Sequence, residues 1–194
     1  ETIGLGFIEI GGITQQEQEG NPKPRMFRSS SSKALINRMG FNNPGSEKMS
    51  ITLEKHFQKY GKPGVPLWIN LGKSKITPLD QSHIDYSTTF EKLWNYGDVF
   101  VINVSSPNTP NLRELQNDES LAKIINSCQE INASLASRNN ISAKPILVKI
   151  APELNDQQLE LVVKTAMSCN CDGIVATNTT TSRPETNSTN ERAI

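Results

Sequence analysis

The feature that most constrains the fold is a repeat of short apolar runs that contain or end in a few polar residues. Five such runs occupy residues 7–12, 66–72, 99–102, 145–152 and 173–180. Continuous Val, Ile and Leu of this length favour strands that are covered on both faces, as in a parallel sheet. We therefore expect five buried strands with polar side chains at their ends.

Helical periodicity fills several of the stretches between these runs. Tyr86, Phe90, Leu93 and Trp94 follow one helical face, and the apolar residues of 121–135 form a second stripe. Asn155 followed by Gln158 approximates a capping box before a third helix. Alternating strands and helices predict a parallel sheet with right-handed crossovers.

Within this α/β class, polar residues at every strand end favour a parallel (β/α)8 TIM barrel. An open doubly wound sheet would gather them at one switch point. We expect residues 1–194 to form a single domain. A complete barrel typically takes about 250 residues, so five strands predict an incomplete segment of one.

Composition and motif spacing exclude several functions. The 20 basic and 20 acidic residues balance, so nothing resembles a basic surface for nucleic acid. No run approaches the roughly 20 apolar residues of a membrane helix. Cys169 and Cys171 are separated by one residue, whereas metal-binding and redox motifs have two residues between their cysteines. We therefore expect no metal site, and we expect Cys128, Cys169 and Cys171 to be reduced thiols.

Polar residues in and after the strands are candidates for a functional site. Lys149 is the one charged residue in an apolar strand, and no carboxylate precedes Glu153 on that strand. Because a buried ammonium needs a partner of opposite charge, we expect a bound anion to be the partner of Lys149. The alternative is a surface lysine that reaches solvent. Asparagine recurs at three strand ends, where its amide can both donate and accept hydrogen bonds, although a single loop Asn is more often a turn residue.

Taken together, these motifs resemble the dihydroorotate dehydrogenases. The resemblance is carried by residues 7–11, 20–28, 37–42, 103–109, 148–152 and 177–180, in the family's order and approximate spacing. Ser106 stands where the soluble class of that family carries cysteine. With residues 24–28, this serine makes the chain similar to the membrane-associated, quinone-reducing class.

The resemblance implies a reaction and its partners. The activity is oxidation of dihydroorotate to orotate in de novo pyrimidine biosynthesis, with flavin mononucleotide (FMN) as hydride acceptor and a quinone as final electron acceptor. The catalytic residues are Ser106 as the base, Thr109 in a relay for its proton, and Lys149 beside the flavin. The implied protein is a monomer that contacts a bacterial cytoplasmic or mitochondrial inner membrane peripherally.

The resemblance also assigns binding residues. The substrate ligands are Asn37, Arg38, Met39, Gly40, Phe41, Asn103, Asn108, Asn178 and Thr179, and the flavin ligands are Gly12, Asn70, Asn103, Lys149 and Thr177. Arg28 would face the tunnel between the flavin and the membrane, and the alternative is a surface arginine that closes a turn. Gly12 departs from the family's usual Ser or Thr, so one hydroxyl contact to the flavin is missing.

Relative to that family, we expect the first barrel strand to lie before Glu1, and the last two strands after Ile194. The membrane-contacting helices are also expected outside this chain, and residues 1–194 alone are expected neither to hold flavin nor to turn over substrate. Two other functions remain open. One is another FMN barrel oxidoreductase acting on a pyrimidine, such as the soluble dihydroorotate dehydrogenase class, against which Ser106 counts. The other is a non-catalytic half-barrel that serves as an interaction module.

Overall fold

Parallel strands form the sheet that the sequence predicts. The computed structural model describes residues 4–108 and 111–182. Its five-stranded sheet has the order β1-β4-β5-β6-β7, and every neighbouring pair is parallel. The strands are β1 (Ile8–Ile13), β4 (Leu67–Leu71), β5 (Val99–Asn103), β6 (Ile146–Ile150) and β7 (Gly173–Ala176). The strand prediction is confirmed, and all carboxyl ends of the sheet point the same way.

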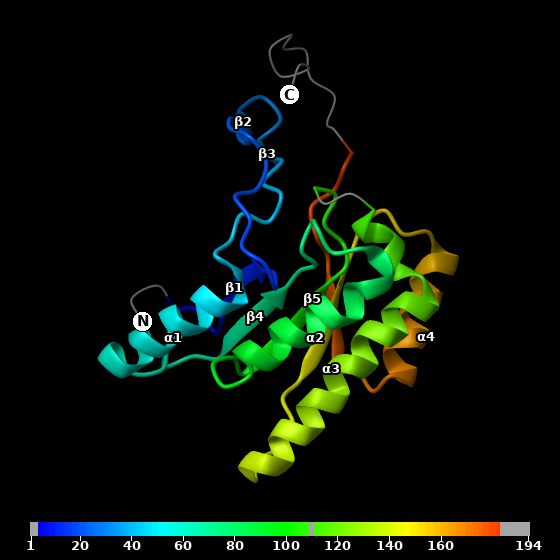
Figure 1. The fold of residues 1–194 in the computed structure, drawn as a ribbon. Helices are drawn as coiled ribbons and strands as arrows, with labels where there is room; N and C mark the ends of the chain where they lie inside the picture. The colour runs from blue at the N-terminus through cyan, green and yellow to red at the C-terminus, as the bar shows by residue number, and fades with distance from the viewer. Residues whose placement is uncertain (1–3, 109–110, 183–194) are drawn as a thin grey trace.

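Helices connect the strands and lie side by side against the sheet (Figure 1). They are α1 (Gly45–Tyr60), α2 (Ser82–Leu93), α3 (Asp118–Asn139) and α4 (Asp156–Ser168), with short 3₁₀ turns at η1 (Leu79–Gln81) and η2 (Leu112–Gln116). Helix α1 packs against α2, α2 against α3, and α3 against α4. This order matches the order of the strands, as right-handed crossovers require.

The sequence predicts three of these helices and misses α1. The capping box of α4 is confirmed, because Asn155 Oδ1 accepts from Gln158 N at 2.9 Å and Gln158 Oε1 accepts from Asn155 N at 3.0 Å. Helix α1 has little apolar periodicity to detect, since Leu53 is its one buried apolar side chain and its other buried residues are glycine and serine.

A two-stranded hairpin interrupts the path from β1 to α1. Strands β2 (Met26–Ser29) and β3 (Ala34–Asn37) pair antiparallel, with Arg28 opposite Leu35. Figure 1 places this hairpin beyond the carboxyl ends of the sheet strands. Residues 26–28, part of the segment that carries the resemblance to the quinone class, lie in β2. Four residues of mixed polarity are too short a pattern to identify a strand.

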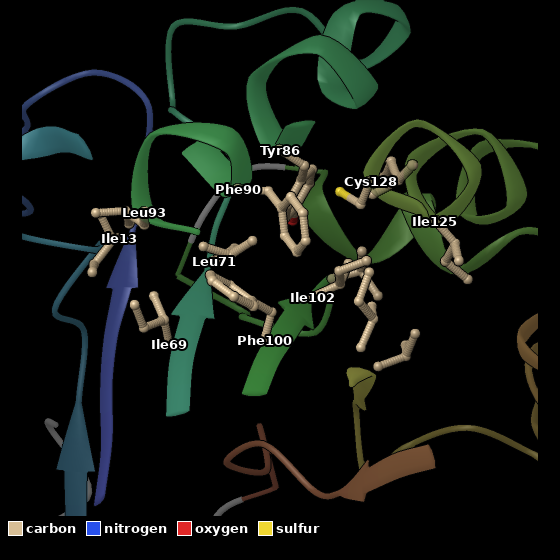
Figure 2. Close-up of a cluster of buried hydrophobic side chains, with 14 of the residues drawn as sticks. Ile13, Ile69, Leu71, Tyr86, Phe90, Leu93, Phe100, Ile102, Ile125 and Cys128 are labelled. Atoms are coloured by element: carbon tan, nitrogen blue, oxygen red, sulfur yellow. The ribbon is translucent and has the colours of Figure 1, made fainter. Parts of the chain in front are cut away.

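The core lies between the sheet and the helices (Figure 2). Alternate strand residues supply it, together with side chains of α2 and α3: Ile69, Leu71, Phe100, Ile102 and Val148 from the sheet, and Tyr86, Phe90, Leu93, Ile125 and Cys128 from the helices. Phe90 and Phe100 pack with ring centroids 4.5 Å apart. By the two-residue period of a strand, Asn70, Asn103 and Lys149 lie on the opposite face.

Tyr86 joins the core to the polar end of the sheet. Its hydroxyl donates to the carbonyl oxygen of Asn103 at 2.8 Å, and the side chain is fully buried. Burial, with a smaller contribution from the charge of Asp85, raises the pKa of Tyr86 well above its usual value. The hydroxyl therefore stays protonated and keeps donating to the last residue of β5.

We expect Tyr86→Phe to lower the free energy of unfolding by roughly 1–2 kcal/mol, because a buried carbonyl loses a donor. Urea unfolding measures the change. The matched control is Tyr60→Phe at the end of α1, where the residue is 65% exposed and the change should stay within about 0.5 kcal/mol. Equal effects of the two substitutions would contradict the role given to Tyr86.

Candidate functional site

A polar pocket of about 340 Å³ opens at the carboxyl ends of the strands. Parallel strands bring their end residues to one edge, so residues distant in sequence meet there. Of the predicted site residues, the lining includes Gly12, Asn37, Met39, Gly40, Phe41, Asn70, Asn103, Ser106, Asn108, Lys149, Asn178 and Thr179. The lining also includes Glu9, Gly11 and Asn42, which the sequence prediction did not assign.

Other predicted residues lie elsewhere. The Arg38 guanidinium donates to the Pro24 carbonyl from Nε at 3.0 Å and lies 5.6 Å from the Phe27 ring centroid, outside the pocket lining. Thr177 is exposed, and its hydroxyl donates to the Asn178 carbonyl at 3.0 Å. Arg28 is exposed on β2. Thr109 lies outside the described residues.

Asparagine side chains link three strand ends to one another. Asn103 Nδ2 donates to Asn70 Oδ1 at 3.1 Å, and Asn178 Nδ2 donates to Asn103 Oδ1 at 3.2 Å. Ser105 Oγ also donates to Asn103 Oδ1, at 2.9 Å. Because its oxygen is engaged in this way, Asn103 is held in one amide orientation, with the second Nδ2 proton left for a ligand. The site is thus ordered by its own hydrogen bonds.

Lys149 has a carboxylate partner in the protein. Its Nζ lies 3.3 Å from Glu9 Oε1, and the two side chains are 20% and 25% exposed. Asn70 Nδ2 donates to the same carboxylate oxygen at 2.6 Å. The expectation of a bound anion considered the residues of β6 alone, and Glu9 of β1 supplies a carboxylate partner that it did not foresee. Glu9 carried the same sequence signal as Lys149, a single charge within an apolar run.

The Glu9–Lys149 contact also reports the curvature of the sheet. Strands β1 and β6 are separated by β4 and β5. Three strand spacings place them about 14 Å apart along the sheet. Side chains that stand upright on a flat sheet would keep that separation. The two side chains meet because the sheet curls around the pocket, as the wall of a barrel does.

Ser106 is 6% exposed in the loop that follows β5. Its Oγ accepts from the backbone N–H of Asn108 at 3.3 Å. The Asn108 side chain in turn donates to Asn37 Oδ1 at 3.1 Å, which joins this loop to the end of the β2–β3 hairpin. Ser106 is therefore largely buried, in a loop that is tied to the hairpin.

The Phe41 ring lies against two glycines. A Cβ at Gly12 would lie 2.8 Å from Phe41 Cε1, and a Cβ at Gly72 would lie 2.9 Å from Cε2. Gln18 Nε2 holds the segment by donating to the carbonyl oxygens of Gly40 and Phe41, both at 3.1 Å. The ring therefore fills the space beside Gly12, where the resemblance would place a hydroxyl-bearing side chain.

Comparison with known proteins identifies the family. A family model described as dihydroorotate dehydrogenase matches residues 1–194. The chain belongs to the dihydroorotate dehydrogenase family. The resemblance drawn from the sequence motifs is confirmed.

The related sequences carry the name of the quinone class. Dihydroorotate dehydrogenase (quinone) of Thermosynechococcus vestitus is 48% identical over 93% of this chain and 46% of its own length. The protein of the same name from Natronomonas pharaonis is 44% identical over 94% of this chain and 48% of its own length. The chain therefore spans about half the length of the curated relatives it matches.

Solved structures agree with this assignment. The crystal structure of DHODH from Eimeria tenella in complex with ferulenol matches with a TM-score of 0.88 and 34% identity, covering 97% of this chain and 54% of that chain. The ligand-free structure from the same organism matches with a TM-score of 0.82. The fold is of the TIM-barrel type, and this chain holds a partial segment of it. Across residues 4–108 and 111–182, no helix has the length and apolar character needed to cross a membrane.

Gly11 provides a test of how tightly the pocket edge is built. Its φ is +122°, and an added Cβ would lie 2.4 Å from the Asn70 carbonyl oxygen. We expect Gly11→Ala to lower the free energy of unfolding by about 3 kcal/mol, because it adds backbone strain and a collision. Gly6→Ala is the control, since nothing lies within 4 Å of that position. A change at Gly11 no larger than at Gly6, measured by urea unfolding, would refute the close approach of β1 and β4.

Proposed function

We propose that the protein carrying this chain oxidises dihydroorotate to orotate in de novo pyrimidine biosynthesis, with FMN as hydride acceptor and a quinone as final electron acceptor. The observation that carries this proposal is the convergence of Ser106, Lys149 and the asparagine side chains on one pocket. Family membership and the names of the relatives support it. Serine at position 106 favours the quinone class over the soluble class.

Substrate recognition is assigned to amides. Orotate offers ring N–H donors, carbonyl acceptors and a carboxylate, and an asparagine side chain complements both donors and acceptors. We assign this role to Asn37, Asn103, Asn108, Asn178 and Thr179, with backbone groups of residues 39–41. The Arg38 guanidinium is engaged by the Pro24 carbonyl, so we assign it to shaping this segment rather than to direct substrate contact.

The residues present fit a flavin. Lys149 supplies a positive charge, Asn70 and Asn103 supply amide groups, and the backbone of Gly11 and Gly12 also lines the pocket. We propose that these groups and Thr177 hold FMN, and that residues 1–194 belong to a single domain and form the central part of a flavin-binding (β/α)8 barrel. When bound, FMN supplies the acceptor for the substrate hydride. Lys149 then stabilises nearby negative charge, while Glu9 keeps its ammonium in place.

Ser106 is assigned as the base that removes the substrate proton. A serine hydroxyl is a weak base, so it requires shielding from water and a path by which its proton leaves. The low exposure of Ser106 meets the first requirement. We propose Thr109 for the second, on the basis of its place three residues later in the sequence.

Electron transfer to quinone is assigned to the hairpin side of the pocket. Arg28 lies on β2, in the hairpin that joins the loop after β5 through Asn37 and Asn108. We propose that Arg28 lines the quinone route, and that the whole protein is a monomer that contacts its membrane peripherally. The chemistry of a lipid-soluble quinone is the reason for a membrane-facing route.

Replacing the base tests the proposed reaction. In the full-length FMN-loaded protein, Ser106→Ala should leave flavin bound but slow its reduction by dihydroorotate by several orders of magnitude, because no other group accepts the proton. Ser106→Cys should retain more activity than Ala, most visibly at high pH, since a thiolate can act as base. Stopped-flow flavin absorbance measures both. Near wild-type reduction in the Ala variant would rule out the role of Ser106.

Arg28→Ala separates the two half-reactions. We expect it to slow reoxidation of the reduced flavin by quinone at least about tenfold, while flavin reduction by dihydroorotate stays nearly unchanged. Separate stopped-flow measurements of reduction and reoxidation give the two rate constants. Equal losses in both would show that the substitution acts on folding and that Arg28 does not serve the quinone.

A further inference from the structure

An ion pair ties together the loops that follow three neighbouring strands. Arg113 is the second residue of η2, and its Nη1 lies 2.9 Å from Glu153 Oε2 in the segment after β6. The two side chains are 26% and 30% exposed. Arg113 Nε donates to the Ser105 carbonyl at 3.1 Å, and its Nη2 donates to the Thr179 carbonyl at 3.4 Å. One guanidinium thus contacts the segments after β5, β6 and β7.

Glu153 completes the connection from its other carboxylate oxygen. Oε1 accepts from Thr180 Oγ1 at 2.7 Å and from Thr181 N at 2.5 Å. Burial opposes ionisation of this carboxyl, but the hydrogen bonds from Thr180 and Thr181 and the charge of Arg113 outweigh it and lower the pKa of Glu153 to about 2. A lowered pKa means that the stabilisation is present above the usual titration range of a carboxyl and is lost as the pH falls through the folded value. The pair is therefore ionised throughout the neutral range.

The residues held by this pair are the neighbours of the proposed chemistry. Ser105 immediately precedes Ser106, and Thr179 immediately follows Asn178. We propose that Arg113 and Glu153 are positioning residues, which fix the proposed base Ser106 relative to the proposed substrate ligand Asn178. This inference rests on the proposed function, because it assigns the pair a part in that reaction. Neither side chain lines the pocket itself.

The size of the expected rate loss follows from how far the proposed base would be displaced. A displacement of a reacting group by about 1 Å can reduce a rate on the order of 100-fold. Gln116 gives η2 a second attachment, since its Oε1 accepts from the Ala151 N–H at 3.1 Å and its Nε2 donates to the Arg113 carbonyl at 3.3 Å. Loss of the Arg113 side chain therefore leaves the loops attached but less precisely placed.

The test uses the full-length FMN-loaded protein with Arg113→Ala, Glu153→Ala and the double variant. We expect each single variant to slow flavin reduction by dihydroorotate about 10- to 100-fold, with the Kd for orotate changed by less than about threefold. The double variant should be no slower than Arg113→Ala, because the pair acts as a unit. Arg113→Lys should recover part of the rate, and the pH midpoint of reduction should not move.

The matched control is Lys164→Ala, which breaks an exposed ion pair with Glu160 on α4 and should leave the rate of flavin reduction unchanged.

Hydrogen exchange without substrate is a second readout, in which Arg113→Ala should speed exchange at residues 103–106 and 178–182. Suppose that the wild-type protein reduces its flavin. The positioning role is then overturned if the reduction rate of Arg113→Ala lies within twofold of the wild-type rate, or if the rate losses of the two single variants multiply in the double variant. If the wild-type protein does not reduce its flavin with dihydroorotate, the proposed function is overturned. In that case, hydrogen exchange that is unchanged in Arg113→Ala overturns the positioning role as well.

Discussion

Strands β1, β4, β5 and β6 each serve two environments, because helices cover one face of the sheet and residues on the other face line the polar pocket. Alternate residues meet these demands separately. Ile102 and Val148 pack toward the helices, whereas the residues that follow them, Asn103 and Lys149, turn toward the pocket. A shift of one residue in the register of either strand would exchange a buried apolar group for a charged or amide group. The apolar core therefore determines where the polar groups of the site can lie.

This constraint explains how far the sequence alone predicts the molecule. Continuous apolar runs identify each strand of the sheet, and the polar residues after the runs of β5 and β7 identify the carboxyl ends of those two strands. The capping box of α4 is predicted because it depends on two side chains three residues apart. Helix α1 and the β2–β3 hairpin escape detection because their periodicity is weak. They are held instead by contacts with distant segments, such as Ser46 Oγ donating to the Gln15 carbonyl at 3.3 Å and Asn108 Nδ2 donating to Asn37 Oδ1 at 3.1 Å.

In the site, as in the fold, the sequence predicts local features and misses contacts between distant residues. Motifs identify residues near one another in sequence, and most of the residues assigned from them line the pocket. The partner of Lys149 could not be found in this way, because 140 positions separate it from Glu9 and the contact depends on the curvature of the sheet. The Arg113–Glu153 pair was likewise invisible, since it depends on how three loops pack. Ser106, by contrast, was found because its whole surrounding motif is continuous in sequence.

The Glu9–Lys149 pair has a consequence for the electrostatics of the pocket floor. Opposite charges 3.3 Å apart largely cancel at any distance much greater than their separation, so the floor presents little net field to an approaching anion. Selection among anionic molecules at this floor therefore depends on the directions of the Asn70 and Asn103 hydrogen bonds more than on long-range attraction. Binding contributed by this part of the pocket is accordingly insensitive to ionic strength, because dissolved salt screens long-range attraction and leaves short hydrogen bonds in place.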